Sequence, residues 1–351
     1  MNGKKIRVLI VDDSSMMRHL LKDLLTSDPE IEIAGVAVDP YEAREKLVEL
    51  KPDVMTLDVE MPKMDGVTFL EKVMKHFPTR TVIISSLTPE GSELALRALS
   101  YGAIDVIAKP KLDVNKGIRE MAHEITSRVK AAAGARLVRY NAPTARPNAF
   151  PTRMETTHKV IAVASSTGGT EALKVFLQGF PKESPGILIV QHMPPVFTRA
   201  YAEFLKSLTG LEVREAKEGD RVLPGTVLLA PGNYHMELAR SGAYYSVHLH
   251  QQETLHGVRP AADYLLKSVA KHAAGNAVGV VLTGMGKDGA EGLLEMKKAG
   301  AFTLAQDEQS CVVFGMPREA IRLGAAEQVL PLDQMAGAIL HYLVGTKSKA
   351  A

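Results

Sequence analysis

Residues 7–21 read RVLIVDDSSMMRHLL, and this pattern is repeated through the first third of the chain. A short apolar run is followed directly by carboxylates, and then by a stretch in which apolar residues recur at helical spacing. Four more apolar runs alternate with amphipathic stretches up to about residue 124: IEIAGVA, DVMTLD, TVIIS and AIDVIAKP. Apolar runs of this length, separated by helical periods, predict a parallel sheet covered by helices on both faces. We therefore expect residues 1–124 to form a doubly wound α/β domain.

The pattern fades over residues 125–157 and then resumes. This segment is rich in Ala, Pro, Arg and Thr, which predicts a helical tail followed by an extended linker, although its arginines could instead contact a partner. From residue 158 to residue 346 further apolar runs alternate with helical stretches; they are VIAVAS, GILIVQ, LEVREA, TVLLAP, AYYSVHLH, AVGVVLTG and AFTLAQ. We expect a second α/β domain there, with a mostly parallel sheet and a β-hairpin near Tyr244.

The composition fits a globular protein of two domains. The chain has 351 residues, of which 46% are hydrophobic and 23% charged. Its net charge is only +2, which argues against nucleic acid as a partner. A single cysteine, Cys311, excludes an intrachain disulfide. The N-terminus lacks a signal-peptide pattern, and no apolar run reaches the roughly 18–20 residues that span a bilayer, so we expect a cytoplasmic protein without membrane insertion.

Charged and hydroxyl side chains follow the apolar runs of the first domain at four strand ends. They are Asp12 and Asp13 after the first run, Asp58 at the end of the third, Ser86 (or its neighbour Ser85) at the end of the fourth and Lys109 after the fifth. Because ligands of open α/β sheets bind beyond the carboxyl ends of the strands, we expect these side chains to meet in one pocket. Each alone could be structural, the aspartates as helix caps and the lysine as a surface charge, but their coincidence favours a shared site.

The chemistry of this pocket follows from its residue types. Converging carboxylates repel one another unless a cation lies among them, and oxygen ligands with remaining water positions suit Mg²⁺. An aspartate can then act as a nucleophile toward a phosphoryl group. The metal and Lys109 would neutralise charge on the transferring oxygens, and the serine hydroxyl could donate a hydrogen bond to the product.

In the second domain, the run VIAVA passes directly into SSTGGTEAL, so that a serine lies at a strand-to-helix junction before two glycines. Such a turn exposes the hydroxyl, and free helix N–H groups can receive an oxyanion. We take Ser166 as the candidate nucleophile and Ser165 as its rival, because Ser166 lies nearer the helix start. The motif is not G-x-S-x-G, and a glycine-rich turn after a strand could equally bind phosphate.

A nucleophilic serine needs a base, and the base needs an orienting acid. His192 ends the run ILIVQH and Asp288 follows AVGVVLTG, so both are expected at the sheet edge that carries Ser166. Either could instead be structural, His192 at a strand end and Asp288 as the cap of the helix after Gly289. The order Ser…His…Asp differs from that of the α/β-hydrolases, so we do not assign that superfamily. Rival bases, none at the end of a clear central strand, are His235, His248, His250 and His256.

The motifs VLIVDDSSMMR, TLDVEMPKMDG, VIISSLT and GAIDVIAKP resemble those of two-component response-regulator receivers over about residues 4–124. The resemblance implies a flavodoxin-like fold and transfer of a phosphoryl group from a histidine kinase to Asp58. The other roles that it implies are Mg²⁺ binding by Asp13, Asp58 and the Glu60 carbonyl, assistance by Asp12, and sensing of the acyl phosphate by Ser86 and Lys109. In the loop MPKMDG, we expect Gly66 to supply backbone freedom.

From about residue 159 to residue 343 the chain resembles the chemotaxis protein-glutamate methylesterases of the CheB type. The resemblance is carried by ASSTGGTEAL, QHMPPVFTRAYAEFL, LTGMGKDGAEGLLEMKKAG and the order receiver–linker–esterase. The roles that it implies are a nucleophile at Ser166, a base and acid at His192, an orienting carboxylate at Asp288, and an oxyanion held by the amides of Met285 and Thr167. The sequence departs from the family pattern at two positions, with Ala164 in place of the usual Gly and Lys287 in place of the common Asn.

This second resemblance implies a phosphorylation-activated hydrolase for adaptation in chemotaxis. Its substrates would be glutamyl methyl esters of methyl-accepting chemoreceptors, and receptor glutamines would be deamidated by the same path, with no cofactor in the hydrolytic site. Two alternatives stay open. The second domain could be a non-enzymatic output domain that binds a partner or DNA, although no helix-turn-helix or basic helix follows the linker. It could also hydrolyse a small ester or amide.

Overall fold

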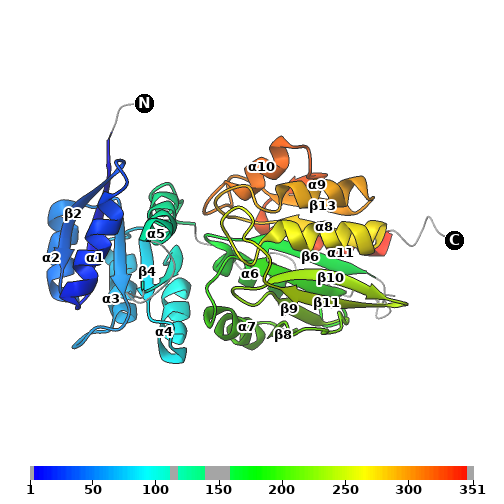
Figure 1. The fold of residues 1–351 in the computed structure, drawn as a ribbon, viewed down its shortest axis with the longest axis horizontal. Coiled ribbons are helices and arrows are strands. Elements are labelled where there is room, and N and C mark those ends of the chain that lie inside the picture. Colours follow the sequence, from blue (N-terminus) through cyan, green and yellow to red (C-terminus); the bar gives the residue numbers. More distant parts are fainter. Residues whose placement is uncertain (1–3, 111–117, 139–158, 346–351) are drawn as a thin grey trace. The chain divides into compact units, whose positions relative to one another are not determined.

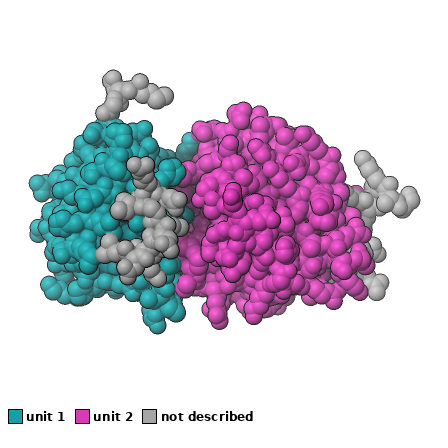
Figure 2. Space-filling view, in the orientation of Figure 1, with its two compact units in different colours: residues 1–137 teal, residues 138–351 magenta. Residues whose placement is uncertain are grey.

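Figure 1 shows the fold in a computed structural model, which describes residues 4–110, 118–138 and 159–345. Two units, residues 1–137 and 138–351, are drawn in separate colours in Figure 2. Outside the described residues lie 1–3 and 111–117 of the predicted first domain, 139–157 of the predicted linker, and 158 and 346 of the predicted second domain. Among the residues that are described, no helix is both long enough and apolar enough to cross a membrane.

The five apolar runs of the first unit form one parallel sheet, in the order β2-β1-β3-β4-β5. Its strands are β1 (Ile6–Val11), β2 (Ile31–Ala37), β3 (Val54–Asp58), β4 (Thr81–Ser85) and β5 (Asp105–Ala108). Strands β3 and β4 are buried along their whole length, which explains why their sequences are continuously apolar and do not alternate. The prediction of a doubly wound parallel sheet is confirmed.

The helices of the first unit are α1 (Ser15–Thr26), α2 (Pro40–Leu50), α3 (Gly66–His76), α4 (Pro89–Ser100) and α5 (Ile118–Ala133). Helices α1 to α4 each begin after a side chain that accepts a hydrogen bond from a first-turn amide; these caps are Ser14, Asp39, Asp65 and Thr88. The strand order reverses between β1 and β3, and ligands of such sheets bind beyond the carboxyl ends of the strands at this reversal.

The second unit is built on a seven-stranded sheet in the order β14-β13-β12-β6-β7-β9-β8, and every pair in it is parallel. Its strands are β6 (Val160–Ser165), β7 (Gly186–Gln191), β8 (Glu212–Glu215), β9 (Thr226–Leu229), β12 (Ala277–Val281), β13 (Phe302–Gln306) and β14 (Gln328–Leu330). The predicted hairpin consists of β10 (His235–Ser241) and β11 (Tyr244–His250), which pair antiparallel. Strand order reverses between β6 and β12, so the end of β6 lies at the reversal.

The helices of the second unit are α6 (Gly169–Gln178), α7 (Phe197–Leu208), α8 (Ala262–His272), α9 (Ala290–Lys298), α10 (Met316–Arg322) and α11 (Leu332–Gly345). In Figure 1, helix α8 lies beside the strands of the hairpin. Buried side chains of α8, of the hairpin and of β6 belong to one hydrophobic cluster; examples are Leu265, Met236 and Val160. This packing fixes the start of α8 next to the ends of the central strands.

Candidate active site

Ser166 lies in the turn between β6 and α6, where two backbone contacts hold it. Its amide donates to the Thr283 carbonyl (3.0 Å), and its carbonyl accepts from the Gly169 amide (2.7 Å). Gly168 adopts a left-handed φ of 77°, and a Cβ atom there would lie 2.4 Å from the Cβ of Val312. The turn therefore requires glycine at this position. Ser166 itself is 7% exposed at the carboxyl end of the sheet.

The neighbouring Ser165 has a different environment. It is fully buried, and its hydroxyl donates to Oε1 of Gln191 (2.7 Å). The Gln191 amide group in turn donates through Nε2 to the Ser166 carbonyl (2.9 Å). Gln191 thus links the ends of β6 and β7, and it accepts the hydrogen bond that the Ser165 hydroxyl donates. This arrangement favours Ser166 over Ser165 as the nucleophile.

His192 and Asp288 meet directly, since Nε2 of the imidazole lies 2.7 Å from Oδ2 of the carboxylate. The same oxygen accepts a hydrogen bond from the Ala262 amide (2.6 Å), and Oδ1 accepts one from the Asp263 amide (3.0 Å). Burial alone would raise the pKa of Asp288, but the contact with His192 and the two amides hold that pKa below its usual value. The carboxylate is therefore ionised and its orientation is fixed.

Ser166 and His192 follow directly on two residues that face each other in the sheet, Ser165 of β6 and Gln191 of β7. Neighbouring strands lie about 4.8 Å apart, so serine and imidazole leave the same sheet edge side by side. The His192 amide also donates to the Ser165 carbonyl (3.1 Å). In the described part of the chain, no hydrogen bond joins the Ser166 hydroxyl to the His192 ring. Because Nε2 contacts Asp288, the nitrogen left for the serine is Nδ1.

The two predicted oxyanion donors come from different segments, Met285 from the loop after β12 and Thr167 from the turn that holds Ser166. Met285 follows Gly284, where an added Cβ would lie 2.7 Å from the Ser166 Cβ, so the backbone passes close to the serine. The Met285 amide donates no hydrogen bond to any residue that the structure describes. Thr167 is buried, and its carbonyl accepts a hydrogen bond from the Thr283 hydroxyl (3.0 Å). Among the described residues, the Met285 amide therefore remains available to donate a hydrogen bond to an oxyanion beside Ser166.

The rival histidines are each held by contacts with other residues. Both ring nitrogens of His235 are hydrogen-bonded, to the Glu253 carbonyl and the Ala261 amide, and burial lowers its pKa to about 4. The remaining rivals contact carboxylates, His248 that of Glu218, His250 that of Glu237 and His256 that of Asp263. Asp288 does not cap α9, whose N-cap position is Gly289, but instead contacts the start of α8.

In the first unit, the predicted acidic pocket is present. Carboxylate oxygens of Asp12, Asp13 and Asp58 lie within 4.8 Å of one another. Nζ of Lys109 contacts Asp58 (2.6 Å) and lies 3.9 Å from Oδ2 of Asp12. That Oδ2 atom is buried and accepts no hydrogen bond from the described residues. Burial, together with the Asp58 charge, raises the pKa of Asp12 to about 6. An acceptor-rich pocket with an unsatisfied buried oxygen fits a divalent cation.

The other predicted residues lie at the ends of β3 and β4 or soon after them. The Ser86 hydroxyl lies 3.0 Å from that of Thr88, while the Ser85 hydroxyl is buried and donates to the Gly91 carbonyl. The Glu60 amide donates to Oδ1 of Asp58 (3.0 Å). We expected Gly66 to supply backbone freedom, and this reason was wrong, because the φ of Gly66 is not left-handed. A Cβ there would lie 2.1 Å from the Asp58 carbonyl oxygen, so glycine is needed for close approach.

Comparison with known proteins identifies this arrangement. The chain matches the family described as CheB methylesterase over residues 161–339. A protein-glutamate methylesterase/protein-glutamine glutaminase of Bdellovibrio bacteriovorus is 60% identical over 97% of this chain and 98% of that protein. The chain belongs to the CheB methylesterase family. Its residues 8–118 also match the response regulator receiver domain. The prediction that one chain carries a receiver domain and a hydrolase domain of this family is confirmed.

Other relatives extend the likeness. A protein of the same description from Pseudomonas aeruginosa is 53% identical over 96% of each chain. Among solved structures, the CheB methylesterase catalytic domain of Thermotoga maritima covers 52% of this chain and 98% of its own length, with 38% identity and a TM-score of 0.52.

Sequence reasoning missed three residues that support the site. Gln191 ties the nucleophile turn to β7, and the buried Thr283 hydroxyl contacts the Thr167 carbonyl and the Val313 amide. Asp263 lies next to Asp288. A polar residue at the end of an apolar run was a usable signal for Gln191. Asp263 lies on α8 and accepts from the Gly292 amide of α9, and no local sequence pattern indicates such a contact between helices.

Proposed function

We propose that this chain removes methyl esters from glutamate side chains of chemoreceptors, and deamidates receptor glutamines, through Ser166, His192 and Asp288. The observation that carries the proposal is the 2.7 Å contact between His192 and Asp288 at the sheet edge where Ser166 begins the turn. The names of the close relatives supply the substrate class. The reaction is proposed to take place in the cytoplasm.

In the proposed reaction each group has its own step. Ionised Asp288 accepts a hydrogen bond from the Nε2–H group of His192, which leaves the Nδ1 lone pair free to take the Ser166 hydroxyl proton. The serine oxygen then bonds to the side-chain carbonyl carbon, and the Met285 amide, with that of Thr167, receives the oxyanion. His192 returns the proton to the leaving methoxide, which departs as methanol. Water, activated by the same imidazole, hydrolyses the acyl-enzyme. With a glutamine substrate, ammonia leaves instead.

The receiver is proposed to control this reaction. Asp58 would accept a phosphoryl group from a histidine kinase, with Lys109 and Ser86 placed to contact the product. Mg²⁺ would be held by Asp13, Asp58 and the Glu60 carbonyl, and it would neutralise charge on the transferring oxygens. The unsatisfied Oδ2 of Asp12 supports this assignment, because a buried carboxylate oxygen without a donor suits a nearby cation or its water.

The test is methanol release from membranes that carry methylated receptors. We expect release by the parent chain, and loss of about six orders of magnitude in kcat for Ser166→Ala, as for other serine nucleophiles. Ser165→Ala is the matched control, since it removes the adjacent hydroxyl, and it should retain activity. Equal activity of Ser166→Ala and the parent would refute the proposed nucleophile. Turnover of small esters without release from receptors would favour the small-substrate alternative.

A further inference from the structure

Helices α8 and α9 are capped in a reciprocal manner, each by an aspartate from the start of the other. Asp288, just before α9, accepts from the first two amides of α8, those of Ala262 and Asp263. Asp263, in the first turn of α8, accepts through Oδ1 from the Gly292 amide in the first turn of α9 (2.7 Å). The residues that directly precede the two helices, Ala261 and Gly289, supply no side-chain cap. The two helix starts are thus tied to each other.

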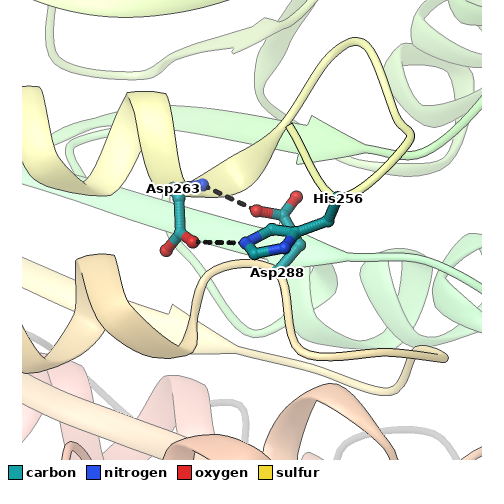
Figure 3. A group of neighbouring side chains, drawn as sticks. All are labelled: His256, Asp263 and Asp288. Carbon is teal, nitrogen blue, oxygen red and sulfur yellow. Dashed lines mark hydrogen bonds and ion pairs between the residues drawn. The ribbon is translucent and has the colours of Figure 1, made fainter. Parts of the chain in front are cut away.

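A third side chain completes the group. Nε2 of His256 lies 3.0 Å from Oδ2 of Asp263, and Figure 3 shows that Asp263 contacts His256 through its carboxylate and Asp288 through its backbone amide. The three side chains lie close enough to share a metal ion. Every carboxylate oxygen among them already accepts a hydrogen bond, however, so hydrogen bonding accounts for the cluster without a metal.

The arrangement is costly for a simple helix cap. Asp263 is fully buried, and burial together with the nearby Asp288 charge raises its pKa. A serine, threonine or asparagine could cap α9 without placing a second carboxyl group beside a buried carboxylate. What Asp263 supplies at this place is the buried oxygen that accepts from Gly292, and an amide oxygen in the same position would supply it as well.

We propose that Asp263 is a positioning residue for Asp288, and that the reciprocal cap sets the orientation in which Asp288 holds His192. This inference rests on the proposed role of Asp288. Asp263 fixes where α9 begins relative to α8, and thereby where the two amides meet the Asp288 carboxylate. Both oxygens of Asp288 are occupied by these amides, so only one direction of Oδ2 remains for the imidazole.

The consequence for catalysis follows from geometry. The imidazole must keep Nε2 on Asp288 and Nδ1 toward Ser166 at once. A displacement of about 1 Å from a change outside the reacting groups can lower a rate by about 100-fold. Loosening the reciprocal cap should therefore lower kcat and leave KM nearly unchanged, because Asp263 is buried away from the substrate.

The experiment compares Asp263→Ala, Asp263→Asn and Val269→Ala in the full chain. Asparagine keeps an oxygen that accepts from Gly292, whereas alanine removes it. Val269 is fully buried farther along α8, within the hydrophobic cluster, and its side chain makes no hydrogen bond, so its truncation should lower stability without removing a cap. We measure kcat and KM for methanol release, thermal unfolding, and the low-field proton resonance of His192 Nε2–H, assigned by its loss in His192→Gln.

We expect Asp263→Ala to lower kcat by about 10- to 100-fold, with KM unchanged and the low-field resonance shifted or broadened. Asp263→Asn should restore both kcat and the resonance, and Val269→Ala should keep both despite its lower stability. The inference is overturned if Asp263→Ala retains the parent kcat, or if Val269→Ala loses kcat as strongly at equal loss of stability. It is also overturned if folded Asp263→Asn is as impaired as Asp263→Ala. Where Asp263→Ala does not fold, the comparison of kcat between Asp263→Asn and the parent decides alone.

The proposed function fails by a different result. If Ser166→Ala releases methanol at the parent rate, the nucleophile is wrong whatever the Asp263 variants do. If Ser166→Ala is inactive and Asp263→Ala is fully active, the function stands and only the positioning role falls.

Discussion

Asp58 in the receiver and Asp288 in the second unit both lie at the carboxyl end of a parallel sheet, and both are almost fully buried. Asp288 receives hydrogen bonds from two amides and contacts His192, and its pKa is lowered. Burial and, to a lesser extent, the charge of Asp13 raise the pKa of Asp58, even though Lys109 and the Glu60 amide act in the opposite direction. One carboxylate is satisfied by fixed donors, and the other is crowded by like charge.

This difference separates two uses of a buried carboxylate. In the proposed reaction, fixed donors hold Asp288 in one geometry while charge develops on the imidazole. The receiver pocket leaves part of its negative charge uncompensated, so it gains stability from a cation or from a change in its own charge. The same substitution, aspartate to asparagine, should therefore have opposite consequences in the two units.

The largest expected effect is that of Asp288→Asn. An amide group cannot accept from His192 and from both backbone amides at once, and it favours the wrong imidazole tautomer. We expect kcat for methanol release to fall by about 10⁴-fold, and unfolding of the second unit to become easier by roughly 1–3 kcal/mol because a buried donor loses its acceptor. Steady-state kinetics and chemical denaturation check the two values. A variant with unchanged kcat would show that Asp288 only caps α8.

Asp58→Asn should act on regulation and not on the triad. The variant lacks the carboxylate oxygen that would bond to phosphorus, so no phosphoryl group is transferred. We expect the rates of methanol release with and without a small phosphodonor to become equal, whereas the donor should accelerate the parent. Phosphorylation is measured separately with radiolabelled donor, and Asp53→Asn, a carboxylate outside the pocket, is the matched control. Stimulation that persists in Asp58→Asn would place the phosphorylation site elsewhere.

The sequence predicted both sheets and most site residues because strand-end positions can be read from apolar runs. Asp12, Asp58, Ser166 and His192 each follow or end such a run, and parallel strands bring their carboxyl ends to one edge. The hydrogen-bond partners were harder. Whether Asp288 capped α9 or α8 depended on which helix start lies nearest in space, and that is set by packing between segments about 25 residues apart.

The role of Gly66 shows the same limit. The sequence indicates that a glycine is needed after the acceptor loop, but a left-handed turn and a close backbone approach leave the same residue in the sequence. Only the distance to the Asp58 carbonyl distinguishes them. The need for a glycine could therefore be predicted from the local sequence. Its physical reason could not, because that reason depends on where two segments of the chain meet.

The smallest expected effect is on stability, and it should run in opposite directions in the two units. The pKa of Asp12 is about 6 in the folded chain against an ordinary value of 3.8. The stability that protonated Asp12 contributes is thus fully present below about pH 3.8 and is lost as pH rises through about 6. Without Mg²⁺, the receiver should gain stability as pH falls from 7 to 5. Asp12→Asn should raise its stability at pH 7 by roughly 1–3 kcal/mol and reduce this slope.

The second unit provides the contrast through His235. Its pKa is about 4 in the folded chain against an ordinary 6.5, so its stabilising contribution is present above pH 6.5 and is lost as pH falls toward 4. Native-state hydrogen exchange reports each unit separately. Between pH 7 and 5 without Mg²⁺, protection should rise in β1 and β3 and fall in β10 and β11, and saturating Mg²⁺ should remove the rise because the cation keeps Asp12 ionised. Parallel slopes in both units, or an Asp12→Asn slope equal to that of the parent, would mean that the receiver carboxylates are not under the strain that their burial and crowding imply.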